Sequence, residues 1–469
     1  MTEAAYAPIL LNDRQVQAFL RSGYLTVDAG LPAAFHTHLH GQIERLFATE
    51  GNPGNDILPL VPDLHQVLTH PRVHGALTSL LGSNYLLHPH RHCHLNPAGS
   101  DGQRMHQDSY EADQNVRHHR CRWLMAFYYP QDVDANRGPS AIVPARQYLT
   151  LGDRPVSSDE LPLHGRAGTV TIVHYDLWHR AMANVGVQDR FMVKLLFTRM
   201  SEPREPSWCH DGTPWASTSE ADDVPGATVW DWMCGAAAVA GGPAVRASGP
   251  VDGLADGLAD GLADGLADGL VVGLADGLVV GLGSSAESER HRAAYRLGSM
   301  GLSGVEALLA ALRLEGQQRV QQNIERAHTN PVQFDAAYGL TVAGVAAVPA
   351  LTKLLAEEIW WLRASAADVL GDIGLYTEVG VQALTTSLTD PSEWVRRNAV
   401  EALGNIGPTA GKAREALAVC LSDPDDAVRH NAALALAKMA GGDKVALQAA
   451  ERDSNHYVRE LATAALARG

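Results

Sequence analysis

Four residues in the first half of the chain have the types and spacing of a catalytic metal site beside an anion-binding group. His106 and Asp108 stand two positions apart, His179 follows 71 residues later, and Arg190 comes eleven residues after that. Two imidazoles and one carboxylate on one face of an ion leave coordination positions open, as in non-heme Fe(II) centres. The planar guanidinium of Arg190 suits a carboxylate. These residues therefore predict iron chemistry with an anionic cosubstrate.

A second His-x-Asp pair, His174 and Asp176, competes for the same role. With 21 histidines in the chain, about one such tripeptide is expected by chance. Both pairs suit a strand, in which positions i and i+2 face the same way. The third ligand decides between them, because His179 ends an apolar, strand-like run whereas His210 lies in a loop rich in Trp, Pro and Gly. The first pair is therefore favoured.

A row of four histidines precedes the metal motif. His88, His90, His92 and His94 alternate with other residues, so they share one face of a predicted strand over residues 85–95. Successive members lie about 6.6 Å apart on a strand, which is too far for one ion to bind them all. We interpret the row as a polar sheet face, with contact to iron or substrate as the alternative.

Length, charge and cysteine usage limit the classes of protein to which the chain can belong. A chain of 469 residues is too long to form a single hydrophobic core, so two or three domains are expected. The formal charge of -16, without any block of Lys and Arg, disfavours a nucleic-acid surface. The five cysteines form no CxxC pair, which is typical of reduced thiols. The first ten residues resemble no signal sequence and no apolar run reaches about 18 residues, so we expect a soluble cytoplasmic protein.

Short strand-like runs between residues 85 and 200 are the main fold signal. They are preceded by three helical patterns, at residues 13–21, 31–48 and 63–81, and by a short strand at 24–27. The later strands are predicted at residues 85–95, 121–129, 141–144, 168–173 and 191–200. Many short strands with Gly, Pro, Asn and Asp between them favour an antiparallel double sheet or jelly roll.

A low-complexity segment separates this region from the last third of the chain. Residues 253–281 repeat Gly-Leu-Ala-Asp with two Val-Val substitutions. Glycine at every fourth position opposes helix formation and a packed core, so we predict a flexible spacer. A calcium-binding β-roll would need a period of nine rather than four. We expect the segment before the spacer, residues 206–250, to pack on the domain of residues 1–205.

Beyond residue 284 the sequence is rich in Ala and Leu and repeats itself. Arg363, Arg396, Arg429 and Arg459 recur at separations of 33, 33 and 30 residues. Each unit is a predicted helix pair that cannot bury its apolar face alone, so stacking must supply the core. The units resemble HEAT-like repeats. We expect the arginines to brace neighbouring repeats and the solenoid of residues 285–469 to offer a surface for a protein partner.

The first 205 residues also contain several motifs in a fixed order. They are His106-Gln107-Asp108, Gly138-Pro139-Ser140 before Val143-Pro144, Gly168-Thr169-Val170, Leu177-Trp178-His179-Arg180 with Asn184, and Arg190. Together they resemble the phytanoyl-CoA dioxygenase family of Fe(II)- and 2-oxoglutarate-dependent oxygenases. The N-terminal helix followed by Gly23-Tyr24 is similar as well. The family usually has Val-Pro-Gly-Ser-His where this chain has Val143-Pro144-Ala145-Arg146-Gln147. We expect this difference to change a local turn and the entrance to the substrate pocket.

The resemblance implies a double-stranded β-helix (a cupin-like jelly roll) with flanking helices, carrying Fe(II), 2-oxoglutarate and O2. By position, His106, Asp108 and His179 would bind the metal and Arg190 the far carboxylate of 2-oxoglutarate. Trp123 and Gln107 match positions that line the cosubstrate pocket. Related halogenases replace the carboxylate with a small residue, so Asp108 implies hydroxylation, or the desaturation, ring formation or epimerisation that the same chemistry can start.

Two functions of different classes remain open from the sequence. The first is a dioxygenase acting on a small organic molecule, with the repeats docking a partner or a carrier. The second is a non-catalytic protein that senses iron or oxygen and mainly recruits a partner through the repeats. No basic patch for coenzyme A is evident, so the family name does not identify the substrate.

Overall fold

The computed structural model describes residues 7–108, 119–149, 159–217, 224–236, 277–325, 330–375, 377–440 and 442–468. The chain divides into two compact units. The first comprises Met1–Glu111, Val116–Trp215 and Glu451–Ala464, and the second comprises Ala112–Asn115, Ala216–Ala450 and Ala465–Gly469. Most of the predicted spacer, residues 253–276, lies outside the described residues.

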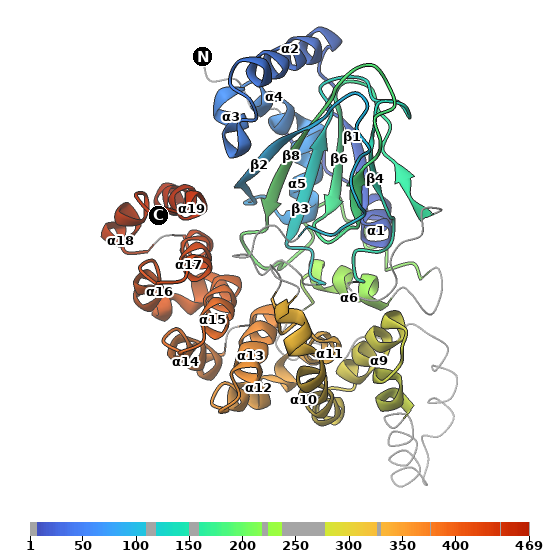
Figure 1. The fold of residues 1–469 in the computed structure, drawn as a ribbon. Helices are drawn as coiled ribbons and strands as arrows, with labels where there is room; N and C mark the ends of the chain where they lie inside the picture. Colours follow the sequence, from blue (N-terminus) through green and yellow to red (C-terminus); the bar gives the residue numbers. More distant parts are fainter. Residues whose placement is uncertain are drawn as a thin grey trace. The chain divides into compact units, whose positions relative to one another are not determined.

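The first unit is built on an antiparallel five-stranded sheet with the order β1-β6-β3-β8-β2 (Figure 1). Its strands are β1 (Tyr24–Asp28), β6 (Thr169–His174), β3 (Trp123–Tyr128), β8 (Arg190–Thr198) and β2 (Leu86–Asn96). Every residue of β3 and β8 is buried, which explains why both strands are nearly continuous apolar runs.

A second antiparallel sheet has the order β5-β4-β7, and its strands are β5 (Leu161–Pro162), β4 (Ser140–Ile142) and β7 (His179–Ala181). Contact between the two sheets is direct, since the rings of Phe127 on β3 and His179 on β7 lie 5.7 Å apart. The predicted antiparallel double sheet is therefore present in the first unit.

Helices flank the sheets of the first unit. They are α1 (Asp13–Ser22), α2 (Ala33–Thr49), η1 (Gly54–Asp56), α3 (Ile57–Leu60), α4 (Leu64–Thr69) and α5 (Pro71–Leu81). The predicted first helix is confirmed, because Asn12 caps α1 in a reciprocal pair with Gln15 and Gly23 ends it with φ +78°. The single helix predicted over residues 63–81 is wrong. Pro71 holds His70 in an extended conformation, so two helices replace one.

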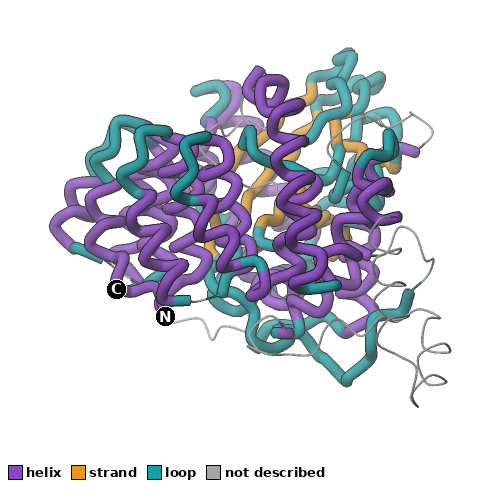
Figure 2. Tube along the Cα trace, turned by 90° about the horizontal axis from the view of Figure 1, so that it is seen from below, coloured by secondary structure: helices purple, strands orange, loops and turns teal. Residues whose placement is uncertain are grey.

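In the parts of the second unit that the structure describes, all the regular elements are helices. Its elements are α6 (Val224–Met233), α9 (Glu287–Ser299), α10 (Leu302–Glu325), α11 (Asp335–Ala343), η4 (Gly344–Ala346), α12 (Val348–Leu354), α13 (Trp360–Ile373), α14 (Glu378–Ser387), α15 (Glu393–Ile406), η5 (Gly407–Ala413), α16 (Arg414–Cys420), α17 (Asp426–Lys438) and α18 (Lys444–Ala450), and the chain closes with α19 (His456–Arg468). The helices α13, α15 and α17 pack against one another in sequence, and Figure 2 shows the helices of the chain in purple. No described helix is long and apolar enough to cross a membrane.

Two of the four recurrent arginines brace adjacent repeats, as predicted, and Arg429 donates to Asp426 of its own helix. Arg363 donates to both carboxylate oxygens of Asp390, and Arg396 donates in the same way to Asp423, in each case 27 residues further along. Each arginine also donates to two backbone carbonyls five and six residues before it. These side chains are committed to the architecture of the solenoid rather than to a ligand.

Two expectations about the middle of the chain do not match the structure. Helix α6 contacts α9 of the second unit, whereas residues 206–250 were expected to pack on the first. Their start packs on the first unit, where Trp208 donates to Asp13 of α1. Residues 277–282 at the end of the spacer are helical. Here Val279 and Val280 replace Ala and Asp, and Leu282 is buried, so packing overrides the low helix propensity of glycine.

Candidate metal centre

The two histidines of the predicted metal site are paired through their backbones. The backbone N–H of His106 donates to the carbonyl of His179 at 3.0 Å, and that of His179 donates back at 2.9 Å. This is the close pairing of an antiparallel ladder, which fixes two residues directly opposite each other. The two rings consequently face each other, with centroids 4.6 Å apart.

Both imidazoles are held in the same orientation by local carbonyl groups. Nδ1 of His106 lies 2.9 Å from the carbonyl of Arg104, and Nδ1 of His179 lies 2.9 Å from the carbonyl of Leu177. A carbonyl can only accept, so each Nδ1 carries the proton and each Nε2 keeps a free lone pair. Burial lowers the pKa of His106, with His179 adding to the effect, which favours the neutral form that a metal requires.

Asp108 completes the group. Its Oδ1 lies 3.7 Å from Nε2 of His106 and 3.6 Å from Nε2 of His179. The ligand atoms of the three residues all lie within 4.8 Å of one another. Burial works to raise the pKa of Asp108, but the charge of Lys194 and the contact with His179 hold it well below its usual value. The site therefore presents two imidazole Nε2 atoms and one carboxylate oxygen to a single point.

Arg190 begins β8 and is almost completely buried, at 1% exposure. Its Nε donates to the carbonyl of Gly138 at 2.9 Å. Its two terminal nitrogens have no hydrogen-bond partner among the described residues, and burial lowers the pKa of the guanidinium. A buried, unpaired cation is costly, so this side chain has the property expected of a group that receives an anion.

The Gly138-Pro139-Ser140 motif holds that arginine in place. Gly138 has φ +60°, and a Cβ at this position would lie 2.3 Å from Nδ2 of Asn96, so only glycine fits. Nδ2 of Asn96 donates to the Gly138 carbonyl, and Asn184 donates in turn to the carbonyl of Asn96. The motif, the asparagines and the arginine thus form one hydrogen-bonded unit.

The two remaining predicted cosubstrate residues lie elsewhere. Trp123 pairs with Thr198, eight residues along β8 from Arg190, and its ring packs edge-on against His88 at 5.4 Å. It therefore lies about 27 Å along the strand from Arg190 and is not beside it. Nε2 of Gln107 donates to the carbonyls of Leu149 and Asp176, so its amide group ties two loops together.

Of the four histidines of β2, two pair with β8 close to Lys194, the residue that binds Asp108. His92 pairs with Lys194 of β8, and His94 pairs with Met192 between Lys194 and Arg190. The rings of His90 and His92 are 4.6 Å apart, and within the first unit Tyr457 lies 3.0 Å from Nδ1 of His90. Burial and the nearby Lys194 charge lower the pKa of His94 to about 3, so this imidazole is neutral, and its Nε2 has no partner among the described residues.

The competing ligand set does not assemble. His210 is 2.7 Å from Oδ1 of Asp13 on α1, and Nδ1 of His174 receives the backbone N–H of Asp176. Burial lowers the pKa of His174 to about 4. His174 is therefore a neutral core residue, and the choice of the first His-x-Asp pair agrees with the geometry.

The second unit contains another group of potential ligands, Glu287, His291 and Asp335. Arginines already occupy it, because Arg290 and Arg319 both donate to Oδ2 of Asp335. His291 lies 3.0 Å from the other oxygen. This group is an ion-pair network that joins α9, α10 and α11, in which cations from the protein satisfy the acids.

The departure from the family's Val-Pro-Gly-Ser-His keeps the turn. Ala145 stands in the left-handed region at φ +62°, where glycine would be unstrained. Its backbone N–H donates to the carbonyl of Ser22. Gln147 is buried and donates to the carbonyl of Leu20. The turn therefore anchors the second sheet to the end of α1.

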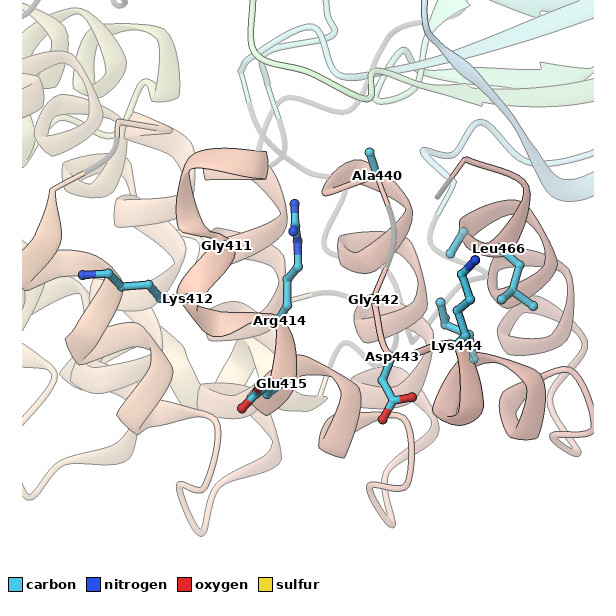
Figure 3. Close-up of a pocket in the computed structure, with 11 residues that line it drawn as sticks. Gly411, Lys412, Arg414, Glu415, Ala440, Gly442, Asp443, Lys444 and Leu466 are labelled. Atoms are coloured by element: carbon cyan, nitrogen blue, oxygen red, sulfur yellow. The ribbon is translucent and has the colours of Figure 1, made fainter.

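A hollow of about 690 Å³ lies in the second unit, between the ends of successive repeat helices (Figure 3). Arg414, Lys412 and Lys444 line it together with Glu415 and Asp443. Arg414 donates to the carbonyl of Met439 at 2.9 Å, and Lys412 pairs with Glu378 at 2.9 Å. The hollow is therefore lined by both acidic and basic side chains, and some of the basic ones already have partners within the solenoid.

Comparison with known proteins gives a family match for part of the second unit. Residues 381–467 match the family of HEAT repeats, and no curated protein matches the chain. The chain is similar in fold to the non-heme alpha ketoglutarate dependent carbocyclase SnoK from nogalamycin biosynthesis, at 18% identity over 42% of this chain and 88% of that one, with a TM-score of 0.35.

Two further solved structures are similar to the chain. HygX from Streptomyces hygroscopicus, with nickel and 2-oxoglutarate bound, is 13% identical over 40% of this chain and 88% of its own, with a TM-score of 0.34. EctD from S. alaskensis, with 2-oxoglutarate and 5-hydroxyectoine, is 18% identical over 45% of this chain and 86% of its own, with a TM-score of 0.36.

Proposed function

We propose that the first unit is an Fe(II)- and 2-oxoglutarate-dependent dioxygenase, similar to the phytanoyl-CoA dioxygenase family, that oxidises a C–H bond of a small organic molecule. One observation carries the proposal. Three ligand atoms of His106, Asp108 and His179 meet within 4.8 Å. Arg190 precedes Lys194, which binds Asp108, by four residues on the same face of β8, and its terminal nitrogens are buried without a partner among the described residues. A site that bound only a metal would not require the buried guanidinium of Arg190.

Each of these side chains has a defined task in the proposal. His106 and His179 offer Nε2 because backbone carbonyls hold their Nδ1 protons. Asp108 offers Oδ1, and Arg190 pairs with the far carboxylate of 2-oxoglutarate through two parallel hydrogen bonds. When bound, Fe(II) and 2-oxoglutarate supply oxidation of the substrate by O2, with release of succinate and CO2.

The row of histidines on β2 is the proposed substrate side of the pocket. Burial lowers the pKa of three of its imidazoles, His90, His92 and His94, and so favours their neutral form. Neutral imidazoles donate or accept one hydrogen bond each without the cost of a buried charge, which suits hydroxyl or carbonyl groups of an uncharged metabolite. Trp123 extends this side with an aromatic surface beside His88. Hydroxylation is the proposed outcome.

The second unit is the proposed docking element. HEAT repeats are stacks of helix pairs whose exposed surface suits protein partners, and residues 381–467 match that family. We propose that the repeats receive a partner or a carrier that presents the substrate. None of the five cysteines is in a disulfide, which supports a reducing cytoplasmic location.

Succinate formation tests the proposal. The full chain, loaded anaerobically with Fe(II), should convert 2-oxoglutarate to succinate when O2 is admitted, and His179→Ala should not. Release of succinate by neither protein, or equally by both, would remove the enzymatic proposal and leave the iron- or oxygen-sensing alternative.

A truncation after residue 283 separates the roles of the two units. If the shortened chain keeps its succinate formation but no longer captures a partner, the repeats deliver the substrate. The truncation also removes Glu451–Ala464, which belong to the first unit, so loss of turnover with Fe(II) binding retained would show that residues after 283 complete the site.

A further inference from the structure

Lys194 binds the oxygen of Asp108 that faces away from the histidines. Its Nζ donates to Oδ2 at 2.9 Å, and the two side chains are 6% and 4% exposed. Oδ1 of the same carboxylate faces Nε2 of His106 and of His179. The two oxygens of Asp108 therefore have different environments, one directed to the metal position and one held by a cation.

The position of Lys194 follows from the strand that carries it. Residues of β8 alternate between two faces, so Lys194 shares the face of Arg190, four positions earlier. It pairs with Phe127 on one side and with His92 on the other. Central β8 residues are otherwise apolar and buried, and burying a lysine there is favourable only with a partner of opposite charge.

A carboxylate can bind a metal through one oxygen or through both. Two-oxygen binding would occupy one of the positions that an iron centre with three protein ligands keeps for its cosubstrate and O2. Charge-assisted hydrogen bonds are among the strongest and most directional in proteins. A lysine bound to Oδ2 therefore competes directly with the metal for that oxygen.

We infer that Lys194 is a positioning residue that restricts Asp108 to one-oxygen ligation and so keeps a coordination position open for 2-oxoglutarate. The inference rests on the proposed function. It assigns to the chain a residue outside the metal and cosubstrate ligands, because Lys194 acts through Asp108.

Replacement of the lysine should change metal and cosubstrate binding in opposite directions. Lys194→Met keeps the length and bulk of the side chain but removes the hydrogen bond to Oδ2 and a positive charge near a divalent ion. Loss of that repulsion and gain of a second carboxylate oxygen both strengthen metal binding. Loss of one open position weakens binding of the two-point cosubstrate.

The experiment uses the full chain with Mn(II) in place of Fe(II). The enhancement of water-proton relaxation by bound Mn(II) reports the number of exchangeable water ligands. For Lys194→Met we expect a fall of about one third, from three water positions to two. We also expect Mn(II) binding about tenfold tighter or more and 2-oxoglutarate binding about tenfold weaker or more. Lys438→Met, which removes a buried lysine bound to Asn405 in the second unit, is the matched control.

If Lys194 had a purely structural role, Lys194→Met would either lose affinity for both Mn(II) and 2-oxoglutarate or leave the number of water ligands unchanged. Either result would overturn the inference. If Lys194→Met does not fold, Lys194→Gln replaces it. Its amide can hold Oδ2 without a charge, so we expect the wild-type water count with tighter Mn(II) binding, and a lost water would contradict the inference. Failure of wild-type protein to bind Mn(II) would instead refute the proposed function itself.

Discussion

His106 and His179 are bonded to each other through both of their backbone amide groups, although 73 residues separate them in the chain. The pairing links a loop to the start of β7 and sets the two rings 4.6 Å apart. Because backbone bonds fix this spacing, the metal position is formed by the fold rather than by the ion. The protein without metal should therefore already have the geometry of the loaded site.

Asp108→Asn should weaken both metal binding and the fold. The amide loses the charge that a divalent ion requires and breaks the ion pair with the buried Lys194. We expect metal affinity to fall by about 100-fold or more and the free energy of unfolding of the first unit to fall by roughly 3 kcal/mol. Metal titration and denaturant unfolding measure the two effects. Asp101→Asn, at an exposed position, should change neither; equal effects of both substitutions would contradict the prediction.

Arg190→Met should have opposite effects on stability and on cosubstrate binding. It removes a buried guanidinium whose terminal nitrogens lack partners, so the free protein should gain about 1 kcal/mol of stability or more. The affinity for 2-oxoglutarate should fall by roughly 100-fold, because two charge-assisted hydrogen bonds are lost. Thermal unfolding and 2-oxoglutarate titration check these changes. A variant that is less stable and binds 2-oxoglutarate normally would show that Arg190 is structural.

Ala145→Gly should stabilise the first unit by about 0.5–1 kcal/mol. Ala145 has φ +62°, a conformation that costs an alanine about 1–2 kcal/mol. Glycine avoids this cost, but its greater conformational freedom in the unfolded chain offsets part of the stabilisation. Ala440, at φ +57° in the second unit, should respond in the same direction. Ala18→Gly inside α1 should be destabilising by about 1 kcal/mol. Denaturant unfolding compares all three, and destabilisation by Ala145→Gly would contradict the strain.

The stability of the second unit should decrease between about pH 4.5 and pH 7. Burial, with the negative charge of Asp335, raises the pKa of Glu315 to about 7. The folded unit therefore keeps a proton that the unfolded chain releases above its ordinary pKa. This contribution is fully present below about pH 4.5 and is lost as the pH rises through 7.

Glu315→Gln should remove that pH dependence, which amounts to roughly 1–3 kcal/mol of unfolding free energy. Unfolding curves at pH 5 and pH 7.5 measure the difference for each protein. Glu306→Gln, at an exposed position of the same helix, is the control and should keep the wild-type slope. An unchanged slope in Glu315→Gln would show that the buried acid is ionised throughout.

The candidate ligands could be predicted from the sequence because their signals are local. His106 and Asp108 follow strand-like alternation, and His179 and Arg190 stand at the ends of apolar runs that became β6 and β8. Pro71 was a sequence signal for the end of one helix and the start of the next. It was overlooked because the apolar residues keep a helical period across residues 63–81. Whether a proline interrupts a helix depends on the conformation of the residue before it. Here that residue is extended, so the helix is interrupted.

The residues that were missed depend on contacts between distant segments. Alternation from Arg190 places Lys194 on the same face, but its partner Asp108 is 86 residues away in sequence. Trp123 was expected near Arg190, and the register that separates them is set by strand pairing between β3 and β8, which no local pattern specifies. The assignment of α6 to the second unit likewise depends on packing with α9.

The most direct test of the central claim is the anaerobic absorption spectrum of the full chain with Fe(II) and 2-oxoglutarate. If His106, Asp108 and His179 hold iron with positions open for a chelating 2-oxo acid, a visible charge-transfer band should appear in wild-type protein and in Asp101→Asn. It should be absent from His179→Ala. A wild-type protein without the band, or a band that survives in His179→Ala, would contradict the account.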